Sequence, residues 1–211
     1  MTALMNAVQR LLARCWQRLA APRMIYGQRS AEGVLRAHSR VSTHARIEAP
    51  ARLLLGDHVF IGHFNFIDAS GGLEIEEGCQ ITNFVSVLTH SSHLSVRLER
   101  ERYWGHAEPA GLQREPSRLG AWSFIGPHSV IAPGTNLGRG VLVRAYSFVS
   151  GEVPDFAVLE GQPARVVGDT RELDRAWIER HAETFGPEAR DAYDAWAREV
   201  VPSATPPPAP P

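Results

Sequence analysis

A repeat of six residues constrains the fold of this chain more than any other feature. Between residues 119 and 149 an aliphatic side chain recurs at every sixth position, and a small or β-branched residue follows four places after each. A period of six fits neither the two-residue alternation of a strand nor the 3.6-residue turn of a helix. It is typical of a coil with three flat faces, and hexapeptide repeats are known in parallel β-helices. The aliphatic positions are Leu119, Ile125, Ile131, Leu137, Val143 and Val149.

The same rhythm begins earlier, at Leu35, but the early coils are longer. There the same face recurs after 20 residues, against 18 residues in the later part. We interpret the difference as two extra residues at one corner of each early coil, around Leu53-Leu54 and Gly71-Gly72. The sequence therefore predicts an all-β core over residues 35–168, a parallel β-helix of about five coils.

The rhythm is interrupted between Val87 and Leu119. Residues 89–118 are therefore predicted to leave the β-helix as an extruded loop. The loop is charged, carries histidines and contains Tyr103-Trp104. Long insertions in compact domains are usually functional or disordered, and the histidines and aromatic residues favour a functional role.

Helices are predicted on both sides of the repeat. Residues 1–34 form an N-terminal helix (3–20) and a lead-in; the helix has arginines on one face and apolar side chains on another. It either caps the end of the β-helix or makes a weak contact with an anionic membrane surface. Residues 169–201 are predicted as one or two helices broken near Gly186-Pro187, and residues 202–211 as a proline-rich, disordered tail.

Composition excludes several classes of function. A net charge of −1 and a pI near 6.8 lack the basic bias of a nucleic-acid-binding protein. All 22 basic residues are arginine, which excludes lysine Schiff-base chemistry. Cys15 and Cys79 have no metal or redox spacing. No apolar run has the length of a membrane span and no signal-peptide pattern is found, so we expect a cytoplasmic protein.

The chain resembles the hexapeptide-repeat acyltransferases, a family with a left-handed parallel β-helix that includes maltose, galactoside and xenobiotic acetyltransferases. It is most similar to the bacterial sugar and surface-polysaccharide O-acetyltransferases. The resemblance covers about residues 35–168 and rests on the repeats, a loop that begins at Thr89-His90, the coil IGPHSVIAPGTNLGRG and the ending VPDFAVLEGQPARVVG. It implies a left-handed β-helix, a homotrimer with active sites between subunits, and acetyl-CoA as the acyl donor.

In that family a histidine at the start of the extruded loop is the general base, and this role falls on His90. Transfer from a thioester to a hydroxyl needs the acceptor proton removed as the bond forms, and imidazole does this well near neutral pH. The thioester is already activated, so neither a covalent nucleophile nor a metal is required. The predicted function is transfer of an acetyl group from acetyl-CoA to a hydroxyl of a saccharide or sugar nucleotide.

Two further groups of residues are candidates for the site. We expect His93 to support His90. The family resemblance implies an Asn and an Asp that bind acceptor hydroxyls. For such residues, hydrogen bonding within a corner of the repeat is an equal alternative. Arginines suit the nucleotide phosphates of acetyl-CoA. The acceptor-binding or supporting candidates are Asn65, Asp68, Asn83, His93, Tyr103 and Trp104. The candidates for binding acetyl-CoA are Gly126, Ala145, Arg144, Gly161, Pro163 and Arg165.

Three alternatives remain open. In the first, the acceptor is an amino sugar and the reaction is an N-acetylation. The chain is a metalloenzyme like the γ-class carbonic anhydrases, with zinc held by His90, His93 and a third histidine across a subunit boundary; the extruded loop and the GQPAR segment argue against this. The chain is a non-catalytic trimeric scaffold, for which the change His90→Ala has no effect.

Overall fold

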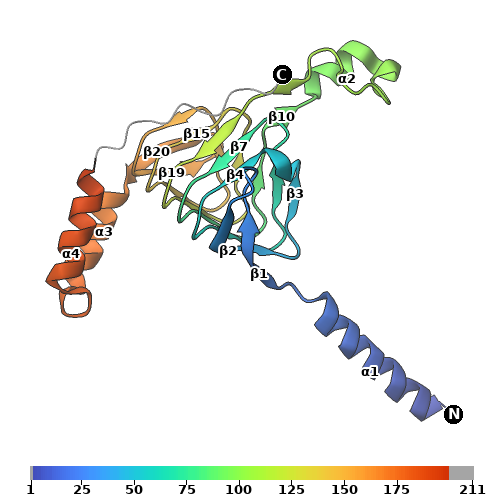
Figure 1. The fold of residues 1–211 in the computed structure, drawn as a ribbon, viewed down its shortest axis with the longest axis horizontal. Helices are drawn as coiled ribbons and strands as arrows, with labels where there is room; N and C mark the ends of the chain where they lie inside the picture. Colours follow the sequence, from blue (N-terminus) through green and yellow to red (C-terminus); the bar gives the residue numbers. More distant parts are fainter. Residues whose placement is uncertain (1, 200–211) are drawn as a thin grey trace.

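A prism of short parallel strands forms the centre of the computed structural model, which describes residues 2–199 (Figure 1). Its three faces wind as a left-handed parallel β-helix of five coils, as predicted. Face A contains β1 (Met24–Arg29), β2 (Leu35–Ser42), β5 (Phe60–Ile61), β8 (Gln80–Ile81), β13 (Phe124–Ile125), β16 (Leu142–Val143), β19 (Ala157–Gly161) and β20 (Ala164–Asp169). Face B contains β3 (Arg46–Glu48), β6 (Phe66–Asp68), β9 (Ser86–Val87), β14 (Val130–Ile131) and β17 (Phe148–Val149). Face C contains β4 (Leu53–Leu55), β7 (Leu73–Ile75), β12 (Ser117–Leu119), β15 (Asn136–Leu137) and β18 (Glu152–Val153).

The chain passes from face A to B to C in every coil, so the prism has an A–B, a B–C and a C–A corner. Equivalent hexapeptide positions lie in register: Ile125 pairs with Ile81 of the coil before it and with Val143 of the coil after it. Their side chains fill the interior, which confirms the inward positions read from the repeat. Those with no exposed surface include Ile61, Ile67, Ile75, Ile81, Leu119, Ile125, Ile131 and Leu137.

The prediction that the inward positions of the repeat begin at Leu35 is wrong. Leu35 is 54% exposed, and Val41 is the first buried aliphatic residue of the repeat. The reason is that Leu35 lies at the start of β2, where its partner is Arg29 of the antiparallel strand β1 rather than a coil of the prism. A second antiparallel strand, β20, pairs with β19 at the other end of face A. The hexapeptide period contains no signal for either strand.

The extra residues of the early coils lie at the B–C corner. One pair is accommodated by the 3₁₀ turn η1 (Pro50–Arg52), directly before β4, and the other between β6 and β7. The first position given by the sequence, Leu53-Leu54, is therefore three residues late, because these leucines belong to β4 itself. The widened corner is the one from which the loop leaves the next coil.

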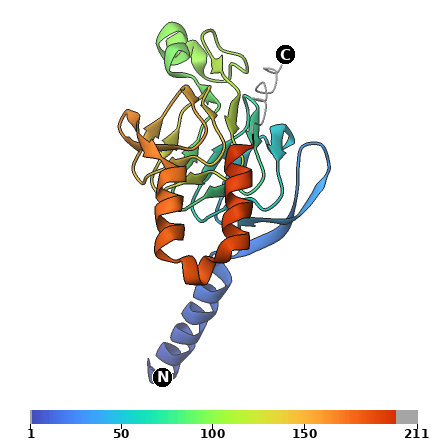
Figure 2. The same ribbon diagram turned by 90° about the vertical axis from the view of Figure 1, so that its left-hand side faces the viewer.

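The helices lie outside the prism. α1 (Thr2–Ala20) extends away from it and does not cap its end (Figures 1 and 2). None of the described helices has both the length and the apolar character needed to cross a bilayer. At the other end α3 (Thr170–Arg180) and α4 (Ala182–Arg198) lie side by side in Figure 2, separated at His181. Gly186 has φ 71° and interrupts α4, where the sequence predicts a break. The predicted tail, 202–211, is outside the described residues.

Candidate active site

The extruded loop leaves the third coil at the B–C corner. Its neck is a two-stranded antiparallel ribbon of β10 (His90–Ser91) and β11 (Gln113–Arg114), in which His90 lies opposite Arg114. Beyond the neck the loop forms α2 (His93–Glu99) and the 3₁₀ turn η2 (Arg100–Tyr103), which Figure 1 shows projecting from the prism. The ribbon fixes the backbone of His90 at the point where the loop meets the prism.

The imidazole of His90 is held by two side chains of the preceding coil. Its Nδ1 lies 2.7 Å from Oδ2 of Asp68 and 2.9 Å from Oγ of Ser70. The side chain of His90 is 36% exposed, whereas that of Asp68 is fully buried. The pair thus joins an interior carboxylate to an imidazole that solvent can reach.

Asp68 stays ionised because several donors surround it. Its carboxylate accepts hydrogen bonds from the amide nitrogens of Ser70 and Thr89, both at 2.9 Å, and from the Thr89 hydroxyl at 3.0 Å. Burial acts to raise the pKa of Asp68, but hydrogen bonds from Ser70, the Thr89 amide and His90 outweigh it and lower that pKa to about 2. An ionised carboxylate only accepts, so Nδ1 of His90 carries a proton toward it. Nε2 then has its lone pair available to take a proton.

The widened corner of the second coil makes this arrangement possible. Ser70 belongs to the segment between β6 and β7, where the inward positions Ile67 and Ile75 are eight residues apart. Gly71 follows, and a Cβ there would lie 2.2 Å from the Thr89 carbonyl oxygen, so only glycine lets the two coils approach. The sequence reasoning missed Ser70. The sequence signal for it is the eight-residue spacing between Ile67 and Ile75, in the coil that precedes the start of the loop.

The other acceptor candidates are spread over three places. Asn83 is at the A–B corner, where its Oδ1 accepts from the His63 amide nitrogen at 2.7 Å, and therefore is not at the corner of His90. His93 begins α2, and its Nδ1 lies 2.7 Å from Oγ of Ser91. Tyr103 and Trp104 lie at the far part of the loop, where Trp104 is 86% exposed. Of the predicted set, Asp68 alone contacts His90.

Asn65 is part of the interior and does not face an acceptor. It is 2% exposed; its Nδ2 donates to the carbonyl oxygens of Gly62 and Thr82, and its Oδ1 accepts from the Val85 amide at 2.7 Å. These contacts favour the corner-bonding alternative for this residue.

Replacing Asn65 with alanine is expected to destabilise the fold without removing a catalytic group. The change leaves the Val85 amide and the Thr82 carbonyl without their side-chain partner inside the prism. We expect a loss of about 2 kcal/mol in the free energy of unfolding, measured by urea denaturation. A loss of transfer activity at unchanged stability would contradict this structural role.

The residues predicted to bind acetyl-CoA gather at the A–B corner of the late coils. A Cβ on Gly126 would lie 2.6 Å from the Ala145 amide nitrogen, so glycine is needed where these coils meet. Gly161 and Pro163 form the turn between β19 and β20. Arg144 is exposed and pairs with Glu160 at 2.6 Å, and Arg165 is also exposed.

Face B separates these residues from His90. The A–B corner precedes face B in each coil, and the B–C corner, with His90, follows it. One chain alone therefore does not bring the two sets of residues together.

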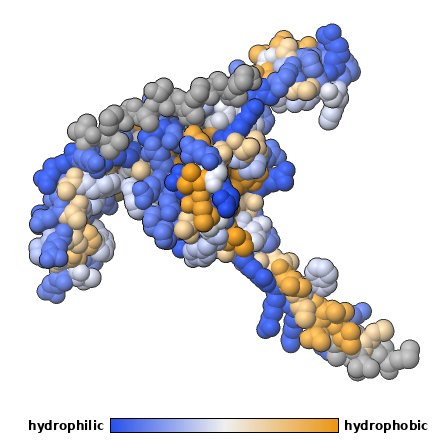
Figure 3. Space-filling model, in the orientation of Figure 1, coloured by the Kyte–Doolittle hydropathy of each residue, from blue (hydrophilic) through white to orange (hydrophobic). Residues whose placement is uncertain are grey.

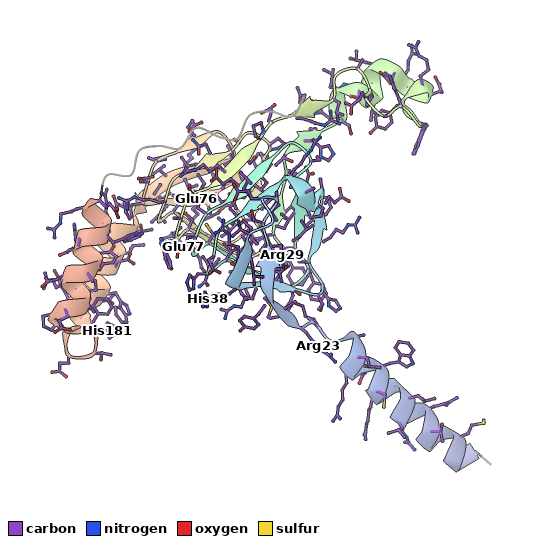
Figure 4. The ribbon with its side chains drawn as sticks, in the orientation of Figure 1. Arg23, Arg29, His38, Glu76, Glu77 and His181 are labelled. Atoms are coloured by element: carbon purple, nitrogen blue, oxygen red, sulfur yellow. The ribbon has the colours of Figure 1, made fainter. Side chains whose placement is uncertain are left out.

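The histidines of the loop do not form a metal site within the described chain. Nδ1 of His90 is directed to Asp68 and Nδ1 of His93 to Ser91. In residues 2–199, the group with ligand atoms close enough to share an ion is His38, Asp57 and His58. It lies at the C–A corner, and Figure 4 shows His38 on the side of the prism away from the loop. The rings of His38 and His58 stack in parallel, 4.6 Å apart at an angle of 3°, so their lone pairs do not converge.

Comparison with curated proteins finds two acetyltransferases. A probable acetyltransferase of Mycobacterium tuberculosis is 35% identical over 57 residues, which are 27% of this chain and 19% of that protein. WbbJ of Escherichia coli, named as a candidate lipopolysaccharide biosynthesis O-acetyl transferase, is 32% identical over 59 residues, 28% of this chain and 30% of that protein. The chain thus matches less than a third of the length of either relative. No protein-family model matches the chain.

Solved structures share the fold at low identity. A galactoside acetyltransferase in complex with coenzyme A superposes with a TM-score of 0.53 and 21% identity, over 62% of each chain. AntD, an N-acyltransferase from Bacillus cereus, superposes with a TM-score of 0.50 and 19% sequence identity, over 68% of this chain and 88% of that one. The sequence matches fall on proteins named as acetyltransferases, and the fold matches fall on enzymes built on the same β-helix. The comparisons therefore show the β-helix fold of these enzymes, together with a partial sequence similarity to two proteins named as acetyltransferases.

Proposed function

We propose that this protein transfers an acetyl group from acetyl-CoA to a hydroxyl of a saccharide or sugar nucleotide. The observation that carries the proposal is the contact between His90 Nδ1 and the buried, ionised Asp68 at the neck of the extruded loop. A carboxylate bound to Nδ1 of an imidazole fixes its tautomer and leaves the lone pair of Nε2 directed away from the carboxylate, which is what a general base needs.

In the proposed reaction His90 takes the proton of the acceptor hydroxyl on Nε2 as the acceptor oxygen attacks the thioester carbonyl carbon. The resulting tetrahedral intermediate collapses when the carbon–sulfur bond breaks, and the departing thiolate receives the proton from His90. Asp68 retains its charge throughout and holds the imidazolium that forms between the two steps. Neither a covalent enzyme intermediate nor a redox change occurs.

The site is completed by a second subunit in this proposal. The cofactor residues, Gly126 and Ala145 among them, lie at the A–B corner, whereas His90 is at the B–C corner. A homotrimer in which the A–B corner of one subunit faces the B–C corner of its neighbour brings the donor thioester to His90. Trp104, 86% exposed at the far part of the loop, supplies an aromatic surface for a pyranose ring.

The nature of the acceptor atom decides between two reactions of the same mechanism. A hydroxyl acceptor agrees with the name of the Escherichia coli relative, which is an O-acetyl transferase. An amine acceptor agrees with the name of AntD, an N-acyltransferase whose structure contains dTDP and an acyl-CoA. We favour the hydroxyl because the Escherichia coli protein matches this chain in sequence, at 32% identity over 59 residues, whereas AntD, at 19% identity, shares the fold.

The proposal is tested by mixing the purified chain with acetyl-CoA and a panel of saccharides and sugar nucleotides, half of them with a free amine. We expect release of free CoA thiol that depends on the acceptor, together with a purified product whose acetyl group is removed by alkaline hydroxylamine, as that of an oxygen ester is. A hydroxylamine-resistant product formed only with amino sugars would replace O-acetylation by N-acetylation. Failure to bind acetyl-CoA in calorimetry would overturn the enzyme assignment.

A further inference from the structure

The helix α1 carries a continuous apolar surface that the rest of the described chain leaves uncovered. Figure 3 shows hydrophobic side chains gathered along α1, and Figure 1 shows the helix extending away from the prism. Its large apolar side chains are between 47% and 70% exposed. They are Met5, Val8, Leu11, Leu12, Trp16 and Leu19.

These side chains share one side of the helix. At 100° per residue they fall within an arc of about 140°, bounded by Leu11 and Trp16. Arg18 lies about 20° outside the Leu11 border of this arc, Arg14 about 60° and Arg10 about 100°, so the arginines extend from the border to the opposite side of the helix. Residues 2–23 contain no Asp or Glu, so the helix and the segment after it carry positive charge alone.

We propose that α1 binds the surface of a membrane that contains anionic phospholipids. An amphipathic helix with apolar and aromatic side chains on one face and arginines beside it lies in the plane of the interface, with the apolar face among the acyl chains. The stems of Arg14 and Arg18 extend along the border and place the guanidinium groups at the phosphates, while Arg10 adds positive charge on the side away from the acyl chains. The helix lies on the bilayer and does not cross it, since no described helix qualifies as a span.

A second copy of the chain fits this surface less well. An arc of about 140° is wider than the narrow a/d seam by which helices pair. Close packing of copies in parallel would also bring rows of Arg10, Arg14 and Arg18 together with no acidic residue on α1 to pair with them. Anionic headgroups, by contrast, complement Arg14 and Arg18 at the border, and the charge of Arg10 adds to the attraction. This inference is independent of the proposed acetyl transfer, because vesicle binding needs neither donor nor acceptor.

The test uses the full chain and two kinds of vesicle, phosphatidylcholine alone and phosphatidylcholine with phosphatidylglycerol at 3:1. We expect sedimentation with the anionic vesicles, weakened by 0.5 M salt and nearly absent with the neutral ones. The triple change R10Q/R14Q/R18Q should weaken binding by about 100-fold, given the attraction of each arginine to an anionic surface. Leu12→Asp should abolish it.

Matched control changes remove the same charge elsewhere. Arg180, Arg190 and Arg198 are exposed on α3 and α4, so R180Q/R190Q/R198Q lowers the positive charge equally and should leave vesicle binding unchanged. Equal binding of the α1 triple variant and the wild type would overturn the proposal. So would failure to bind anionic vesicles, or a fall in oligomer size with Leu12→Asp, which would assign the surface to a second copy. Acetyl transfer to a soluble acceptor should be the same in both triple variants.

Discussion

The change His90→Ala is expected to lower kcat by about 10²- to 10⁴-fold while acetyl-CoA binds as before. In the proposed mechanism the imidazole takes the acceptor proton, and its removal leaves water to do so. His90 is 36% exposed, its loss leaves no cavity in the prism interior, and Asp68 keeps its donors Ser70 and Thr89, so the protein should remain folded with only a small decrease in Tm. The measurements are the rate of thiol release at saturating donor and acceptor, and calorimetric binding of CoA.

A matched control is His38→Ala. His38 also has its Nδ1 against a carboxylate, Asp57, at 2.9 Å, but at the C–A corner. This variant should keep the wild-type rate, because its Asp–His pair lies away from the loop. An undiminished kcat in His90→Ala would remove the basis of the proposed mechanism and support the non-catalytic scaffold.

The period of the sequence accounts for how much of the fold was predictable. Each inward aliphatic residue, such as Ile81 or Ile125, is dictated by a packing requirement that repeats identically in every coil. Elements that occur once have no such redundancy, which is why β1 and β20 were missed and Leu35 was assigned to the core. They pair antiparallel with β2 and β19, and this pairing does not follow from the six-residue period.

The site was predictable where it interrupts the repeat and not where it depends on neighbouring coils. His90 stands out because the rhythm stops there. For Asp68 the sequence leaves acceptor binding and corner bonding as equal alternatives, because only the stacking of the second coil under the third brings its carboxylate to His90. The same two alternatives apply to Asn65, and the hydrogen bonds of its amide group to the backbone favour corner bonding.

The described part of the chain contains two Asp–His contacts, and the proposed mechanism assigns a role in catalysis to one of them. Asp68 and Asp57 each hold the Nδ1 of a histidine, and hydrogen bonds overcome burial to lower the pKa of each carboxyl. Asp68, however, is fully buried and joins the neck of the loop, whereas Asp57 lies at a corner with stacked, exposed imidazoles. Position at the interruption of the repeat distinguishes the two.

The change Asp68→Asn is expected to lower kcat by about 10²-fold with little effect on the Kd for CoA. Asparagine is uncharged and can turn either its oxygen or its amide group toward Nδ1, so the His90 tautomer is no longer fixed; such outer partners are commonly worth 10–100-fold. A purely structural role would alter stability and leave kcat per folded molecule intact. The control Asp57→Asn, at the other Asp–His pair, should leave kcat unchanged.

The same variant should alter how stability depends on pH. The pKa of Asp68 is lowered to about 2 in the folded protein, below its value in the unfolded chain, so its contribution is complete above about pH 5 and is lost as the pH falls toward 2. At pH 3 the wild type should have lost about 1 kcal/mol of this contribution, whereas Asp68→Asn has none to lose. Urea unfolding of both proteins at pH 6 and pH 3 measures the difference. A stability gap between them that stays constant over this range would show that Asp68 is not held ionised beside His90, and the fixed tautomer on which the general base depends would lose its support.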